Sequence, residues 1–272
     1  MYIHDSHVHT KYSFDGARDG SGEIDVIIET AISRGVNEIS LCDHCDIDDI
    51  LDGIYPEYPA EEIKADVLRA KEKHKGKIQI NYGVELGQAH VRPVEARELL
   101  DKYGFDFVIG SLHNLRGYPD FHFLKLSEMC GEHIEYLMTR TFSELRELVD
   151  FGCFSTLAHI TYIQRYLALA GKDFDYRKYR DEYESLFRAL ITTGTALEVN
   201  TSGLRRGSIT MPGYELCGMY RELGGEFITL GSDAHTARDV SLGIEEAAAA
   251  LRDIGFRSQT VVRGGVLAQV EL

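Results

Sequence analysis

The sequence predicts an α/β fold in which parallel strands form a closed barrel or a doubly wound open sheet. Short apolar runs alternate with longer amphipathic stretches seven times along the 272 residues. Glycine is common at the C-terminus of a helix. Five glycines lie between a predicted helix and the following strand: Gly35, Gly104, Gly152, Gly194 and Gly225. No Pro/Ser-rich linker divides the chain, so we expect a single domain spanning residues 1–272.

The hydrophobic pattern sets the expected elements in order. We expect strands at 2–9, 36–43, 78–86, 105–112, 155–160, 195–200 and 226–232, with a further short strand at 259–263. Helices are expected at 23–34, 60–74, 93–102, 131–150, 175–193, 213–223 and 239–252. The last helix has the strongest signal, because Glu245, Glu246 and a run of alanines favour helix.

Composition and charge restrict the class of protein. Hydrophobic residues make up 44% of the chain and charged residues 27%, which is typical of a globular enzyme, and no apolar run is long enough to cross a bilayer. The first ten residues lack the basic and apolar regions of a signal peptide, so we expect a cytoplasmic protein without a membrane partner. A net charge of −15 repels polyanions, which argues against nucleic acid but allows a small anionic substrate at a metal site.

The five cysteines do not suggest a disulfide framework, because their number is odd. Cys42 and Cys45 form a single C-x-x-C, which allows a redox or zinc interpretation, but no second C-x-x-C accompanies it. For Cys130, Cys153 and Cys217 we expect small buried apolar side chains.

Each predicted strand ends in an acidic or metal-binding side chain. In strand order these are Asp5, His7 and His9; Asp43 and His44; Glu85; His113; His159; Glu198 and Asn200; and Asp233 and His235. Residues two apart share one face of a strand, so His7 and His9 can bind one metal. Parallel α/β folds build their sites at these carboxyl ends. His, Asp and Glu ligands without thiolates suit Zn, Mn or Fe.

Each of these residues also has a structural interpretation. A single His is more often a satisfied core or surface residue, and we assign His4, His74, His90, His122 and His133 to that class. Asp43 or Glu198 alone could cap a helix. Seven strand ends together are not explained in this way, so the sequence predicts a metal site. Asp5 and Asp43 are candidates for carboxylates that orient ligand histidines.

This ordered set resembles the PHP (polymerase and histidinol phosphatase) family over nearly the whole chain. The resemblance implies a distorted (β/α)7 barrel that carries two to three transition metals, with Zn, Fe or Mn as candidates. It implies a first metal on His7, His9, Glu85 and Asp233, a second on Glu85, His113 and His159, and a third on Asp15, His44 and His235. Glu85 would bridge the first two metals, and Glu85, Asp233 and His235 would be catalytic. Many members have His where Asp15 stands.

Two segments resemble the histidinol-phosphate phosphatase branch of that family. One is the run from Glu198 through Asn200 and Arg205 to Arg206, and the other places Arg165 after His159. A guanidinium offers paired donors to phosphate oxygens, so Arg165 and Arg205 are expected to bind substrate together with Asn200 and Glu198. The resemblance implies hydrolysis of L-histidinol phosphate to L-histidinol and phosphate in histidine biosynthesis.

Three alternatives remain open at the level of sequence. A phosphoesterase of the same family could act on another small phosphate or a nucleotide. An amidohydrolase is another H-x-H barrel, but Glu85 at strand three and the Asp233-x-His235 motif favour a phosphoesterase. A non-catalytic metal-binding scaffold is disfavoured because all the expected ligand positions are filled.

Overall fold

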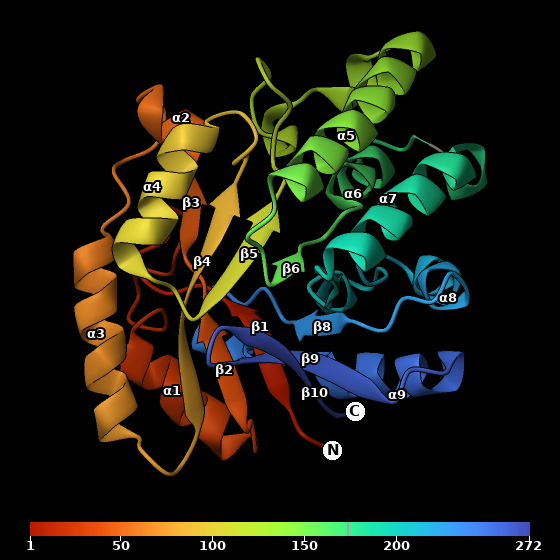
Figure 1. The fold of residues 1–272 in the computed structure, drawn as a ribbon. Coiled ribbons are helices and arrows are strands. Elements are labelled where there is room, and N and C mark those ends of the chain that lie inside the picture. Colours follow the sequence, from red (N-terminus) through yellow and green to blue (C-terminus); the bar gives the residue numbers. More distant parts are fainter. Residues whose placement is uncertain (173) are drawn as a thin grey trace.

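The computed structural model describes residues 1–172 and 174–272, apart from the side chain of Arg206. Its main sheet is parallel, in the order β1-β2-β4-β5-β6-β7-β8, with β3 paired to β4 (Figure 1). The strands are β1 (His4–Val8), β2 (Glu38–Leu41), β3 (His44–Asp46), β4 (Gln79–Gly87), β5 (Phe107–Ser111), β6 (Thr156–Leu157), β7 (Ala196–Asn200) and β8 (Ile228–Gly231). All seven strongly predicted strands are therefore present, and the expected strand at 259–263 is β9 (Ser258–Arg263).

The two ends of the sheet meet, which makes it a nearly closed barrel. Val8 and Ala234 form a parallel bridge between the end of β1 and the segment after β8. The His9 N–H donates to the Ala234 carbonyl at 2.8 Å, and the Asp233 N–H donates to the His7 carbonyl at 2.8 Å. The expected distorted (β/α)7 barrel is confirmed, and the choice between a barrel and an open sheet is settled by this contact.

Helices surround the strands and bury the outer face of the barrel (Figure 1). They are α1 (Ile24–Ser33), α2 (Ile47–Leu51), α3 (Ala60–Lys73), α4 (Pro93–Tyr103), α5 (Gly131–Phe151), α6 (Tyr162–Leu169), α7 (Arg180–Thr193), α8 (Tyr214–Glu222) and α9 (Ile244–Ile254). Within the described part of the chain, no helix is both long and apolar enough to cross a membrane.

Two predicted helices begin later than expected. The helix predicted from residue 239 begins at Ile244, because Ser241 and Gly243 adopt left-handed backbone angles, with φ of 56° and 83°, that end any earlier turn. The helix predicted from residue 175 begins at Arg180, because the Asp175 side chain accepts a hydrogen bond from the Arg177 N–H and opens a 3₁₀ turn instead.

Four short elements were missed. They are β3, α2, α6 and β10 (Val266–Glu271), which pairs antiparallel with β9. The helices α2 and α6 are only five and eight residues long and have no side-chain cap, so neither carries a strong helical signal.

The β9–β10 hairpin lies across the amino-terminal ends of the barrel strands, near both chain ends (Figure 1). Val262 of β9 packs against an apolar cluster of Cys42, Phe107, Ile109 and Ala158. The hairpin also supplies Arg263, whose guanidinium donates to both carboxylate oxygens of Glu38, at 2.8 and 2.5 Å.

Loss of the Arg263 guanidinium should destabilise the barrel. Glu38 is fully buried, and its only other donors in the described chain are the Tyr2 hydroxyl at 2.9 Å and the Asn81 amide at 2.8 Å. Arg263→Ala would leave a buried carboxylate without its cation, so we expect about 2–4 kcal/mol lower free energy of unfolding in urea. Arg252→Ala, at an exposed arginine on α9, should change it by less than about 0.5 kcal/mol. Equal stability of the two variants would contradict this account.

Candidate active site

A cavity of about 890 Å³ opens at the carboxyl ends of the barrel strands. Six of the predicted metal ligands line it: Asp15, His44, His113, His159, Asp233 and His235. The other three, His7, His9 and Glu85, are at most 1% exposed and lie beneath its floor. The structure therefore brings all nine predicted ligands to one place.

A bulge in β1 turns the His7 side chain into the barrel. His4 packs edge-on against Phe107 in the barrel interior, with ring centroids 5.7 Å apart. His7 lies an odd number of residues further on and would face outward in a regular strand, yet it also faces the interior. The pairing of β1 with β2 shifts register between Asp5 and Val8, and such a bulge redirects the side chains that follow it.

Hydrogen bonds fix which nitrogen of each histidine faces the cluster. The Nδ1 of His7 lies 2.7 Å from a Glu198 carboxylate oxygen and donates to it. The Nδ1 of His9 lies 3.0 Å from the Ser13 hydroxyl, which itself donates to Asp43 at 2.8 Å and so must accept from the ring. When both rings are neutral, both Nε2 atoms therefore carry lone pairs, and they lie 3.0 Å apart. Two facing lone pairs repel each other unless a cation binds both.

The Glu85 carboxylate lies between two groups of histidines. Its Oε2 is 3.4 Å from the Nε2 of His7 and 3.5 Å from that of His9. Its Oε1 is 3.1 Å from the Nε2 of His113 and 2.9 Å from that of His159. One carboxylate oxygen thus faces each group, which is the arrangement that a bridging ligand requires.

Asp233 adds a second carboxylate to the group formed by His7 and His9. Its Oδ1 lies 3.3 Å from the Nε2 of His9 and 4.0 Å from that of His7. The backbone of Asp233 is left-handed, with φ of 52°, and that of His159 has φ of 25°. Non-glycine residues hold such angles at a cost of about 1–3 kcal/mol each, which is typical of positions where a functional side chain must be aimed.

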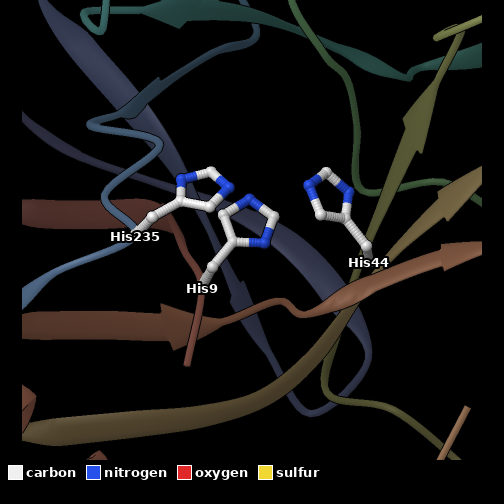
Figure 2. A group of neighbouring side chains, drawn as sticks. All are labelled: His9, His44 and His235. Atoms are coloured by element: carbon white, nitrogen blue, oxygen red, sulfur yellow. The ribbon is translucent and has the colours of Figure 1, made fainter. Parts of the chain in front are cut away.

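A third group lies at the mouth of the cavity. The imidazole rings of His44 and His235 lie on either side of His9, with ring centroids 4.2 and 4.0 Å from it (Figure 2). The carboxylate of Asp15 reaches both rings, 3.0 Å from the Nε2 of His235 and 3.7 Å from the Nε2 of His44. The Nδ1 of His235 lies 3.1 Å from the Asp233 carbonyl and donates to it, so its Nε2 presents a lone pair.

The cluster fits bound cations. Four of its buried polar atoms have no hydrogen-bond partner in the described chain: Glu85 Oε2, His44 Nδ1, His159 Nδ1 and His235 Nε2. The first two lie 2.8 Å apart without hydrogen-bond geometry. Buried polar atoms are rarely left unpaired, and imidazole and carboxylate donors together suit Zn, Mn or Fe.

Close contacts between histidines and carboxylates shift the pKa values of both in this site. Burial raises the pKa of the Glu85 carboxyl group, but His113, His7 and His44 outweigh burial and hold that pKa well below its ordinary value. Burial lowers the pKa of His44, but the Glu85 carboxylate outweighs burial and raises that pKa to about 9. The metal-free cluster thus keeps protons on histidines that metals would replace.

This proton on His44 predicts a pH-dependent metal affinity. The ring of the metal-free protein is protonated below pH about 9, and a metal must displace that proton. Apparent zinc affinity should therefore fall by about tenfold per pH unit, per displaced proton, as the pH drops from 9 towards neutrality. Competition with a chromophoric chelator, corrected for the chelator's own protonation, measures it. An affinity that does not change over this range would contradict the assigned ionisation.

Asp5 and Asp43 brace the loops that carry the ligands. Asp43 accepts from the N–H and hydroxyl of Thr10, at 2.6 and 2.7 Å, and acts on His9 only through Ser13. Asp5 accepts from the N–H and hydroxyl of Ser232, at 2.8 and 2.6 Å, and contacts none of the ligand rings. The predicted orienting role thus fits Asp43 indirectly, and Asp5 fixes the segment before Asp233.

The arginines expected to bind substrate lie on the cavity wall. Arg165 lines it from α6, with its guanidinium carbon 5.9 Å from the centre of the Tyr166 ring. Arg205 lines it from a 3₁₀ turn and donates to the backbone carbonyls of Ser232 and of Asp233, the latter at 3.0 Å. Arg206, in the same segment, has a side chain outside the described part of the structure.

Glu198 and Asn200 lie behind the ligands and do not line the cavity. The second carboxylate oxygen of Glu198 accepts from the His159 N–H at 2.9 Å and from the Asn200 amide at 3.2 Å. Both residues are fully buried. Glu198 therefore orients His7 and His159, and the cavity wall on this side is formed by Arg205.

Several cavity residues were missed by sequence reasoning. Arg238 and Asp120 line the cavity, as does His122, for which the sequence predicts only a core or surface role. Arg238 follows the Asp233-x-His235 motif by three residues, and that proximity is the only sequence signal for it.

Cys42 and Cys45 are free and buried, and burial raises the pKa of both thiols, which argues against a reactive C-x-x-C.

Fold and site together define an α/β barrel with a metal-binding cluster at the carboxyl ends of its strands. The chain belongs to the PHP domain family, whose model matches residues 5–202. The resemblance noted from the sequence is therefore confirmed.

Curated relatives match over most of their length. A protein named histidinol-phosphatase from Lactococcus lactis is 27% identical over 265 residues, which cover 96% of this chain and 94% of the relative. A protein named probable histidinol-phosphatase from Clostridium acetobutylicum is 29% identical over 257 residues, covering 90% of this chain and 91% of the relative.

A solved structure has the same fold. The crystal structure of histidinol phosphate phosphatase from Lactococcus lactis, in complex with Zn, L-histidinol and phosphate, aligns with a TM-score of 0.82. The alignment covers 98% of both chains at 23% sequence identity.

Proposed function

We propose that this chain is a metal-dependent phosphoric monoester hydrolase that converts L-histidinol phosphate to L-histidinol and phosphate. The observation that carries the proposal is the Glu85 carboxylate between two groups of histidines, directly beneath a cavity lined by Arg165 and Arg205. The names of the relatives supply the alcohol half of the substrate. We further propose that the catalytic domain spans residues 1–272, since Ala234, beyond the family match, completes the barrel.

The residues that would hold the metals follow from the three groups. His7, His9, Glu85 and Asp233 would hold the first, Glu85, His113 and His159 the second, and Asp15, His44 and His235 the third. Zinc is the first candidate, since the lone pairs offered are imidazole and carboxylate. When bound, such metals lower the pKa of water and neutralise charge on phosphoryl oxygens.

The chain's own side chains complete the chemistry. Arg165 and Arg205 orient the phosphoryl group by donating to its oxygens from the cavity wall. The Asp233 carboxylate, partly open to the cavity, would accept a proton from the attacking water and return it to the oxygen of the leaving alcohol. His235 holds this loop through its bond to the Asp233 carbonyl.

A substrate comparison tests the proposal. The metal-loaded protein is assayed for phosphate release from L-histidinol phosphate, an aryl phosphate and a nucleoside monophosphate. We expect kcat/KM to be highest for L-histidinol phosphate. If the nucleotide or the aryl phosphate is turned over equally well, the substrate assignment is wrong and a phosphoesterase with another substrate remains. Turnover of amides but not of phosphates would instead indicate an amidohydrolase.

Loss of either arginine should weaken turnover of phosphate monoesters. Arg165→Ala and Arg205→Ala each remove charged donors from the cavity wall, so we expect kcat/KM to fall by an amount equivalent to about 1.5–3 kcal/mol for each. The Arg205 variant also loses its bonds to Ser232 and Asp233, so metal content is measured in parallel. Exposed Arg188→Ala on α7 is the control. Wild-type kinetics in both cavity variants would remove the arginines from the phosphate site.

A further inference from the structure

Asp46 lies beneath the second histidine group, which is formed by His113 and His159. The sequence pattern does not single it out. It ends β3, beside β4, and is only 3% exposed. Its Oδ1 lies 2.6 Å from the Nδ1 of His113, the shortest contact made by that ring. Since the carboxylate accepts the Nδ1 proton, the Nε2 of His113 is the nitrogen that faces Glu85, 3.1 Å away, and that would bind a metal.

The local backbone is built to admit this carboxylate. A Cβ atom on Gly87 would lie 2.1 Å from the Asp46 Oδ1, so only glycine fits at that position of β4. Gln88, the next residue, is buried and left-handed, with φ of 50°. In the amide orientation that satisfies its neighbours, it donates to the Asp46 Oδ1 at 2.9 Å and accepts from the His113 N–H at 3.0 Å. The carboxylate and the ring are thus held from both sides.

His159, the other histidine on this side of Glu85, has no such support. Its Nδ1 is buried without a hydrogen-bond partner in the described chain, and its backbone is left-handed. Glu198 holds the His159 backbone, but in this group only the His113 ring is fixed by a hydrogen bond at its Nδ1. We propose that Asp46 is a positioning residue that fixes the tautomer and direction of His113, and that Gly87 and Gln88 exist in these forms to hold it. This inference rests on the ligand set proposed above.

The contribution of Asp46 is tested by metal affinity. Zinc binding to the metal-free protein is titrated against a competing chelator, and the spectrum of the cobalt-substituted protein reports the ligand geometry. Asp46→Ala removes the acceptor, so we expect about 10–100-fold weaker affinity at one site and an altered cobalt spectrum. Asp46→Asn keeps a carbonyl oxygen as acceptor for the His113 N–H, and should stay within about threefold of the wild type.

A neighbouring carboxylate provides the matched control. Asp48 is 5% exposed and bonds the Asn114 amide at 3.1 Å, but does not contact a ligand ring. Asp48→Asn removes the same charge from the same segment and should leave affinity and spectrum unchanged.

The outcomes separate the inference from the proposed function. Wild-type affinity in Asp46→Ala would overturn the positioning role. Equal loss in the Asn and Ala variants would also overturn it, because charge and not the hydrogen bond would then be responsible. A wild-type protein that binds no zinc would instead contradict the proposed metal site itself.

Discussion

Glu85→Gln should lower kcat/KM for a phosphate monoester by several orders of magnitude while the fold survives. The carboxylate faces His7 and His9 with one oxygen and His113 and His159 with the other. Replacing it with a neutral amide removes the negative charge between two proposed cations. We expect a loss equivalent to about 3–4 kcal/mol or more of transition-state stabilisation, the scale of one major electrostatic element.

A second buried carboxylate controls for the loss of charge alone. Glu144 is 2% exposed and bonds His90 at 3.1 Å, away from the cavity. Glu144→Gln should therefore retain metals and activity even if the protein becomes less stable. Glu85→Gln with normal kcat and a full metal complement would refute the bridging role.

Removal of the metals should abolish activity and lower the thermal stability. In the metal-free site the Nε2 atoms of His7 and His9 lie 3.0 Å apart with at most a proton between them, and Glu85 Oε2 and His235 Nε2 are buried without partners in the described chain. Metals that bind only the folded chain add about 4 kcal/mol at a free concentration of a thousand times Kd. For a chain of this size we expect Tm to fall by roughly 10 °C on chelation.

Adding metals back to the chelated protein tests whether the losses of stability and activity are due to the metals. Adding back zinc or manganese to the chelated protein should restore both Tm and activity. Calcium, which prefers six to eight oxygen ligands, should restore neither. An unchanged Tm and rate after complete removal of metals, verified by elemental analysis, would show that the cluster needs metals neither for stability nor for catalysis.

Much of the fold and site could be predicted because both follow from local sequence. The alternation of apolar runs and helices sets the strands, and the ligands follow the strand ends directly, as at His159 and Asp233. Closure into a barrel was not fixed by periodicity, because it depends on the contact between Val8 and Ala234, far apart in the chain.

The parts that were missed depend on contacts between distant segments. Nothing local to Asp46 indicates that it meets His113, or that Gly87 makes room for it. Glu198 is expected to bind substrate because its segment resembles the histidinol-phosphate phosphatase branch, but its side chain points at His7 beneath the cavity. The sequence pattern gives the strand end, while the direction of the side chain depends on the twist and bulges of the sheet.

The most direct test of the account is phosphate release from L-histidinol phosphate by protein of known metal content. Elemental analysis and kcat/KM are measured on the same sample, purified without chelator. The account predicts two to three equivalents of transition metal per chain and a kcat/KM well above that for a generic aryl phosphate. A protein that contains no transition metal, or whose metal-loaded form releases no phosphate from L-histidinol phosphate, would contradict it.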